Sequence, residues 1–188
     1  MKKYMLTVIV EHKNRTISQQ SLDALNSALN MASINKSSLR ALALSDEHLI
    51  DEEKFTKEFG INMEILLNSK LTNYSAEGYI QALTDFFKNS PSDFIIIPHT
   101  PQGYDYAPGL ALHLKIPCIT AVTDIKGYNG TASFQRLCAG GRLESKVISK
   151  YNKAVITVNP AQGKTLINTG ESAPAIYANK INLSLEKT

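Results

Sequence analysis

Short apolar runs alternate with segments of helical periodicity along the first 122 residues of the chain. The apolar runs have the length and the β-branched content of strands, and the helical segments repeat their apolar residues every three or four positions. We predict strands at residues 4–10, 39–44, 64–67, 94–97 and 118–122, and helices that start at Ser18 or span residues 46–59, 75–88 and 105–114. Strict alternation of strands and helices favours a parallel sheet with helical crossovers, which is an α/β fold.

The pattern changes after Thr123, where three strand-like segments follow one another without helices, at residues 133–138, 143–148 and 154–158. Gly140-Gly141 and the segment 151–153 are typical of hairpin turns. We therefore predict antiparallel strands added to the parallel sheet. The expected organisation is a single domain with a parallel core over 1–124 and an antiparallel extension and tail over 125–188, including a turn-rich stretch at 160–174 and a last edge strand within 176–185.

Composition narrows the class of protein. The chain has 188 residues, the size of one domain, and its net charge of +3 comes without a dense lysine or arginine cluster, which argues against nucleic-acid binding. Cys118 and Cys138 lie far apart with no CxxC spacing, so no zinc site is predicted. The first apolar run reaches Glu11 quickly and lacks a cleavage site, which predicts a first strand, no membrane span and a cytoplasmic protein.

The loop after the strand at 94–97 is the main candidate site, because ligands of open α/β sheets bind at the carboxyl ends of the strands. In one interpretation this loop binds a nucleotide or a partner, and free N–H groups at the next helix start hold an anion. In the other interpretation, Gly103 permits a turn, Asp105 caps the helix, Pro108 sits in its first turn, and His99 and Thr100 satisfy backbone groups. The sequence leaves both open. The loop residues concerned are His99, Thr100, Gln102, Gly103 and Asp105.

Other candidate chemistry is weaker. Glu11 and His12 end the first strand, but adjacent strand residues point to opposite faces. Gly140-Gly141-Arg142 lies between two strands and lacks the strand-to-helix context of a phosphate loop. We find no serine–histidine–aspartate set, no paired carboxylates and no metal-ligand spacing, so we predict that the chain is not an enzyme by itself.

The order of several motifs resembles the N-terminal domain of the electron-transfer flavoprotein alpha subunit. The matching segments are Val10-Glu11-His12, Ser21-Leu22-Asp23-Ala24-Leu25, Tyr74-Ser75-Ala76-Glu77, the stretch from His99 to Ala111, Thr123-Asp124-Ile125, Gln135-Arg136-Leu137-Cys138-Ala139-Gly140 and Val155-Ile156-Thr157-Val158-Asn159-Pro160. Arg136 stands where the family keeps an arginine. The resemblance implies a Rossmann-like sheet of the adenine-nucleotide α-hydrolase-like type.

Three positions depart from the family pattern. Tyr104, Gly109 and Asn159 stand where the family has arginine. Arginine is the residue suited to bidentate contacts with anions, so the family roles of these three guanidinium groups are not expected here.

The resemblance implies a scaffold domain that pairs with a beta-like subunit, takes electrons from a dehydrogenase and works with FAD. The candidate cofactor contacts are His99, Thr100, Gln102, Gly103, Asp105 and Arg136. In the family a second domain supplies most of the flavin pocket, whereas this chain stops at Thr188, so we expect it to bind FAD weakly or not at all when alone. The alternatives are a freestanding domain that holds AMP or ATP at the 99–105 crevice, and an interaction module that binds neither.

Overall fold

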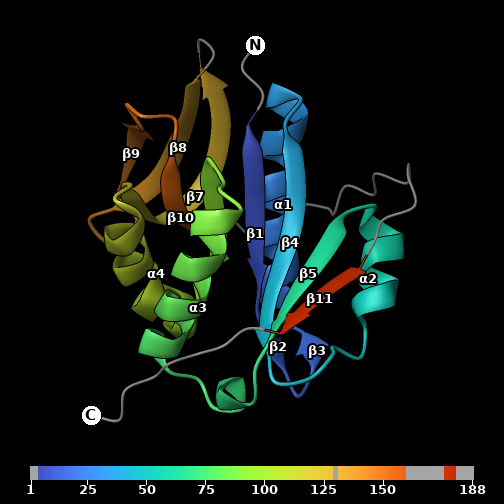
Figure 1. Ribbon diagram of the computed structural model, residues 1–188. Helices are drawn as coiled ribbons and strands as arrows, with labels where there is room; N and C mark the ends of the chain where they lie inside the picture. The colour runs from blue at the N-terminus through green and yellow to red at the C-terminus, as the bar shows by residue number, and fades with distance from the viewer. Residues whose placement is uncertain (1–3, 129–130, 160–175, 181–188) are drawn as a thin grey trace.

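The computed structural model describes residues 4–128, 131–159 and 176–180 (Figure 1). The strands of the main sheet are β1 (Met5–Val10), β4 (Ser38–Ser45), β5 (Asn62–Leu67), β6 (Phe94–Pro98), β7 (Cys118–Tyr128), β8 (Thr131–Cys138), β9 (Leu143–Ile148), β10 (Ala154–Val158) and β11 (Ile176–Lys180). A small hairpin consists of β2 (His12–Lys13) and β3 (Thr16–Ile17). The helices are α1 (Gln19–Asn35), α2 (Glu52–Phe59), the 3-10 turn η1 (Ser69–Leu71), α3 (Ala76–Asn89) and α4 (Pro101–Leu114).

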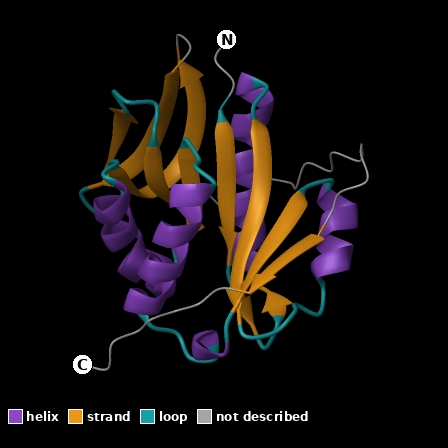
Figure 2. Cartoon of the chain, in the orientation of Figure 1, coloured by secondary structure: helices purple, strands orange, loops and turns teal. Residues whose placement is uncertain are grey.

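Within these residues the main sheet has nine strands in the order β11-β5-β4-β1-β6-β10-β7-β8-β9. The seven strands from β11 to β7 are mutually parallel, and β8 and β9 are antiparallel additions at one edge. This is the α/β, Rossmann-like arrangement predicted from the alternating pattern, with antiparallel strands near the C-terminus. Figure 2 shows the sheet with helices on both of its faces.

The prediction was wrong for the strand at residues 154–158. We expected it to be antiparallel, but β10 lies between β6 and β7 and is parallel to both. All five of its residues are buried, and a continuous apolar run of this kind is typical of a parallel strand covered on both faces. The segment 151–153 is therefore part of a crossover and not a hairpin turn.

The far edge strand was predicted in position but not in direction. β11 is an edge strand, as expected, but it lies at the edge opposite to β9 and pairs in parallel with β5. The parallel part of the fold therefore includes two strands from the region that we had assigned to the antiparallel extension. The turn-rich stretch at 160–174 and the end of the predicted strand, 181–185, lie outside the described residues.

Two apolar clusters fill the two sides of the sheet. Helices α1 and α2 pack on one face, and α3 and α4 pack together on the other (Figure 1). The buried strand β6 contributes to both clusters through alternation: Phe94 and Ile96 face α1, whereas Ile95 and Ile97 face α3 and α4. The core therefore fixes β6 from both sides, and with it the loop that follows.

Helix α4 starts four residues earlier than predicted. Thr100 is its N-cap, because its Oγ1 accepts a hydrogen bond from the Gly103 N–H at 2.9 Å, and Pro101 occupies the first turn. Asp105 is thus not the cap. Pro108 lies in the helix interior, where it cannot donate the usual backbone hydrogen bond.

Three other helix boundaries follow their expected signals more closely. Ser18 and Ser75 cap α1 and α3 through their side chains, and Gly60 ends α2 in the left-handed conformation with a φ of 63°. Helix α2 begins at Glu52 and not at residue 46, because residues 46–51 form a loop. The Asp51 carboxylate in that loop accepts from the Ile17 N–H and does not cap α2.

Candidate functional site

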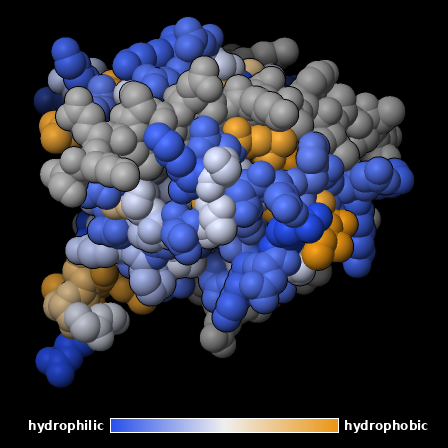
Figure 3. Space-filling model, turned by 60° about the horizontal axis from the view of Figure 1, so that its bottom comes forward, coloured by the Kyte–Doolittle hydropathy of each residue, from blue (hydrophilic) through white to orange (hydrophobic). Residues whose placement is uncertain are grey.

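The candidate site lies where the chain reverses its order in the sheet. Strands β4 and β5 follow β1 on one side, and β6 lies directly on its other side. Ligands of open α/β sheets bind outside the carboxyl ends of the strands at such a switch point. This edge is at the bottom of Figure 1 and faces the viewer in Figure 3, which shows a mostly hydrophilic surface with separate hydrophobic areas. The residues that meet there come from the ends of β1, β6 and β10 and the start of α4.

A buried carboxyl group lies beneath the start of α4. Glu11, which follows β1, is only 8% exposed, and the Thr100 hydroxyl donates to its two carboxylate oxygens at 2.9 and 2.8 Å. The same hydroxyl oxygen accepts from Gly103 N–H, so one Thr100 side chain connects Glu11 to the first turn of α4. Burial raises the pKa of Glu11 to about 7, although the Thr100 hydrogen bond acts in the opposite direction.

Gly103 is required by close packing and not by a turn. It lies within α4, and a Cβ at this position would overlap the carbonyl oxygen of Pro98 and lie 2.8 Å from Ile97 Cγ2 and 3.1 Å from Glu11 Oε1. Only glycine lets the first turn of α4 approach the end of β6 this closely. We expected Gly103 to permit a turn. In the structure, glycine is needed at this position because a side chain would not fit between α4 and the end of β6.

Three tyrosines extend from the surface toward Glu11. The rings of Tyr74 and Tyr79 are 5.1 Å apart, and those of Tyr79 and Tyr106 are 5.3 Å apart. Tyr106 is fully buried, and its hydroxyl has no hydrogen-bond partner among the described residues. Burial, followed by smaller effects that include the Glu11 charge, raises the pKa of Tyr79 to about 12 and that of Tyr106 well above its usual range. All three phenols are therefore protonated at neutral pH.

Two of the predicted loop residues, Gln102 and Asp105, are hydrogen-bonded to these tyrosines. The Tyr74 hydroxyl donates to Asp105 Oδ2 at 2.8 Å and to the main-chain oxygen of Gln102 at 3.3 Å. A hydrogen bond from the Gln102 side chain also acts on Tyr79. Asp105 thus ties the loop before α3 to α4.

His99 contacts strand β10 at the same edge of the sheet. Its Nδ1 is hydrogen-bonded to Thr157 Oγ1 at 2.8 Å, and the N–H of Ala121 donates to the same oxygen at 3.0 Å. Ala121 has a φ of 56°, a left-handed conformation that marks an irregularity in β7. Burial lowers the pKa of His99, and the charge of Arg136 lowers it further.

Arg136 is the one candidate residue that lies outside the loop after β6. It is half-buried on β8, and its buried Nε has no hydrogen-bond partner among the described residues. Its effect on the pKa of His99 shows that the two side chains act on each other electrostatically. The candidate site therefore presents one guanidinium group without an ion-pair partner in the part of the chain that the structure describes.

Sequence reasoning missed four contributors: Glu11 as a partner of Thr100, the three tyrosines as a group, Thr157 and Ala121. Glu11 carried a usable signal, because it directly follows an apolar buried strand. Its neighbour His12 points elsewhere, with Nε2 hydrogen-bonded to Leu44 O at 3.0 Å, so the two side chains do not act together. Gly140 and Gly141 form the predicted hairpin turn between β8 and β9, with φ values of 66° and 85°.

The geometry limits what this edge can do chemically. Among the described residues no group of three or more histidine, cysteine, aspartate or glutamate side chains could hold a metal ion. While Glu11 is ionised, the start of α4 is a poor anion site, because Thr100 already takes the Gly103 N–H and the Glu11 carboxylate lies against it. None of the described helices combines the length and the apolar character needed to cross a membrane.

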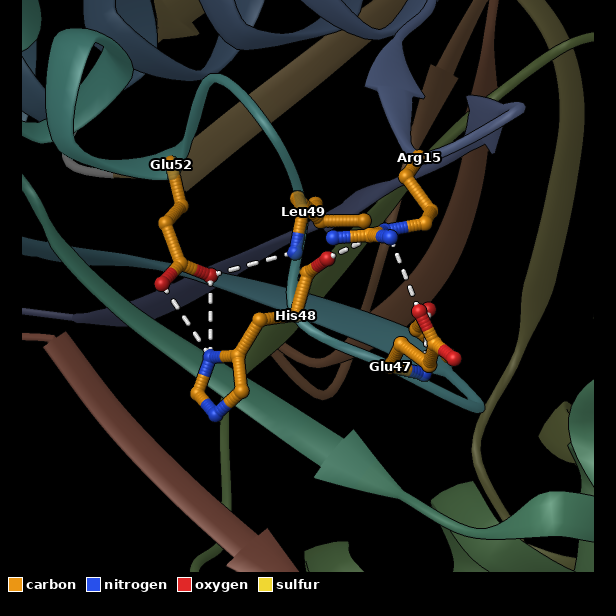
Figure 4. Close-up of polar contacts among 6 residues, drawn as sticks. Arg15, Glu47, His48, Leu49 and Glu52 are labelled. Atoms are coloured by element: carbon orange, nitrogen blue, oxygen red, sulfur yellow. Dashed lines mark hydrogen bonds and ion pairs between the residues drawn. The ribbon is translucent and has the colours of Figure 1, made fainter.

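A second surface feature lies beside α2 and shares no residue with the candidate site. A shallow hollow of about 680 Å³ is lined by Leu49, Ile50, Glu52, Glu53, Lys54, Lys57 and Glu58. The loop before it is held by Glu52, which accepts from Leu49 N–H and contacts His48 Nδ1 at 3.1 Å, and by an Arg15–Glu47 ion pair of 2.8 Å (Figure 4). These contacts are mostly exposed, so they order the loop and add little stability.

Comparisons with known proteins agree with this architecture. Residues 6–180 match a family model described as "Electron transfer flavoprotein domain". The chain is also 31% identical over 91 residues to the electron transfer flavoprotein subunit alpha of Bacillus subtilis (strain 168), a match that covers 48% of this chain and 28% of that relative. Both findings confirm the resemblance that the motifs predicted. Because the family model covers nearly the whole chain, the protein belongs to the electron transfer flavoprotein domain family.

Proposed function

We propose that this chain is the scaffold domain of an electron transfer flavoprotein-like complex, which pairs with a beta-like subunit and passes electrons from a dehydrogenase through FAD. The family match over residues 6–180 is the observation that carries this proposal. In such a complex the flavin supplies the redox chemistry, and the protein binds and orients it. The chain contributes a rigid α/β domain and one face for assembly.

The described residues fit FAD poorly when the chain is alone. At the start of α4, where a pyrophosphate would seek free N–H groups, Glu11 and Thr100 already occupy the first turn. Of the six candidate cofactor contacts, Thr100 and Gly103 are used in the cap, and Gln102 and Asp105 bind the tyrosines. His99 and Arg136 are left as the groups that contact the cofactor or its second binding domain in the assembled complex.

The edge of the sheet at β9 is the proposed contact with the beta-like subunit. β9 pairs with β8 on one side, and no strand of the described residues pairs with its other side. Leu143 and Ile148 on this strand are 64% and 46% exposed, and Tyr151 beyond it is 73% exposed. An uncovered edge with exposed apolar side chains offers both main-chain hydrogen bonds and apolar area to a second chain.

The test is co-expression with the beta-like subunit of the same host, followed by mass determination and a visible spectrum of the purified material. We expect a yellow complex for the unchanged chain and loss of the complex for the double variant Leu143→Lys/Ile148→Lys. Leu112→Lys is the matched control, because Leu112 is 76% exposed on α4 and away from this edge. Assembly of the double variant at the level of the control would contradict the proposed interface.

The isolated chain tests the cofactor part of the proposal separately. We expect it to purify without flavin, and near-stoichiometric flavin absorbance would contradict this. The alternative of a freestanding AMP- or ATP-binding domain has less support, because the candidate site offers one guanidinium and a carboxyl group where phosphates would lie. A thermal shift with either nucleotide would favour this alternative, since a ligand that binds only the native state raises its apparent stability.

A further inference from the structure

Glu11 is a buried carboxyl group that the scaffold role does not explain. It lies at the switch point of the sheet, and its backbone is fixed to α1, because the Glu11 N–H donates to Ser21 Oγ at 2.7 Å and Ser21 Oγ donates to Glu11 O at 3.0 Å. Among the described residues its carboxylate oxygens accept only from Thr100, and no cation of that part of the chain forms an ion pair with it. A rigid backbone therefore holds the carboxyl group in a place with little solvent and no counter-charge.

The groups around this carboxyl also lack positive charge. From α4 it faces the Thr100 hydroxyl, and the hydroxyl of Tyr106 lies within its electrostatic reach. The phenol of Tyr79 on α3 and that of Tyr74 in the preceding loop also respond to its charge. The other acidic member of this group is Asp105, which accepts a hydrogen bond from Tyr74. These neighbours are phenols, a hydroxyl and a carboxylate, so they cannot neutralise Glu11 and a proton is the one available counter-charge.

We propose that Glu11 is a proton-binding site coupled to the charge at the start of α4: it takes up one proton from solvent when negative charge is placed over the first turn of α4, and releases that proton when the charge leaves. The pKa of about 7, which results from burial, puts both states within reach at neutral pH. The proposal rests on the packing of α4 on β1 and β6 and does not depend on the flavoprotein complex. It can therefore fail or hold independently of the proposed function.

The hydrogen bonds give the mechanism of coupling. When Glu11 is ionised, Thr100 must donate its single hydroxyl hydrogen to the carboxylate while it accepts from Gly103 N–H. When Glu11 is protonated, its own O–H donates to Thr100 Oγ1, which still accepts from Gly103. The Thr100 hydrogen is then no longer held by the carboxylate and can be donated to an anionic group placed over the first turn of α4. The cap of α4 is kept in both states, and only the direction of one hydroxyl changes.

The experiment is an NMR titration of the glutamate carboxyl carbons in the full 188-residue chain, with Glu11→Gln used to assign the Glu11 signal. Charge is then changed at Tyr104, which is 58% exposed in the first turn of α4, with the variants Tyr104→Lys and Tyr104→Glu. The matched controls are Leu112→Lys and Leu112→Glu, at a 76% exposed position near the other end of the same helix.

We expect Glu11 to titrate near neutral pH, with its midpoint lowered by Tyr104→Lys and raised by Tyr104→Glu. The two variants should differ by roughly half a pH unit or more, because the charges are close and screening by water is reduced near the buried carboxyl. The Leu112 variants should leave the midpoint within about 0.2 of the unchanged chain, because more than one screening length of protein and solvent intervenes. A Glu11 midpoint in the ordinary range near 4 to 5, or equal shifts from positions 104 and 112, would overturn the proposal.

Discussion

Replacement of Gly103 by alanine is predicted to lower the free energy of unfolding, although helix propensity alone favours alanine. Alanine in place of glycine inside a helix is worth about 1 kcal/mol in favour of the folded state. At Gly103 the new Cβ would overlap Pro98 O and lie 2.8 Å from Ile97 Cγ2, and neither the backbone nor the buried strand can move away. Overpacking of this kind costs about 1–3 kcal/mol, and displacement of the Thr100 cap adds about 1 kcal/mol. We expect a net loss of roughly 2 kcal/mol.

Gly109→Ala is the matched comparison, because it makes the same substitution in the same helix. There the new Cβ would meet the end of the Ile80 side chain, which can change rotamer at a cost of about 0.5–1.5 kcal/mol. That cost and the gain in propensity nearly cancel, so Gly109→Ala should lie within about 0.5 kcal/mol of the unchanged chain. Urea unfolding followed by circular dichroism measures the free energy of unfolding of both variants, which can be compared when the slope m against urea concentration is the same. Close packing at Gly103 would not be the cause if Gly103→Ala is as stable as the unchanged chain, or if the two variants lose stability equally.

Three further predictions concern buried polar groups. The folded pKa of Glu11, about 7, exceeds its usual value of 4.5, so the folded state binds the proton more tightly and stability should fall as the pH rises from about 4.5 to 7. This difference is worth roughly 3 kcal/mol, and Glu11→Gln should lack that part of the pH dependence; parallel curves of unfolding free energy against pH would contradict it. Thr100→Ala should cost about 1–2 kcal/mol by loss of the cap, whereas Thr100→Ser should keep most of the stability in the same urea assay. Arg40→Lys should cost about 1–3 kcal/mol of unfolding free energy. Arg40 donates to Thr7, Ser90 and Ser92 and stacks over Phe86, 4.8 Å from the ring centre, and lysine cannot copy this geometry. A loss below about 0.5 kcal/mol on thermal or urea unfolding would speak against this.

Local signals in the sequence predicted most of the elements for identifiable reasons. The serines at positions 18 and 75 and the glycine at position 60 mark helix ends through caps that depend on only a few neighbouring residues. The apolar run at β6 predicted a strand buried on both faces, and its alternation divides the two cores as observed. The antiparallel pair β8–β9 was predicted from its glycine turn, since a hairpin is a contact between neighbours in sequence.

The errors arose where pairing was not local. The apolar run of β10 is typical of a strand covered on both faces, but its neighbours in the sheet are not a local property, and the packing of the whole sheet places it between β6 and β7. The start of α4 was misplaced because Asp105 and Thr100 are both good caps by composition. The Tyr74 hydroxyl binds Asp105, and the buried Glu11 binds Thr100; these partners lie 31 and 89 residues away in the sequence.

The sequence alone determined the α/β class and the family, because strand length, helix periodicity and motif order are properties of the chain itself. The loop after β6 as the main site stays a prediction. Tertiary structure decided what the residues of that loop do. Glu11 acquires its raised pKa by burial beneath α4, and Gly103 is needed because the end of β6 lies against it. Burial and close approach depend on residues that are distant in sequence, so they arise only once the sheet has assembled.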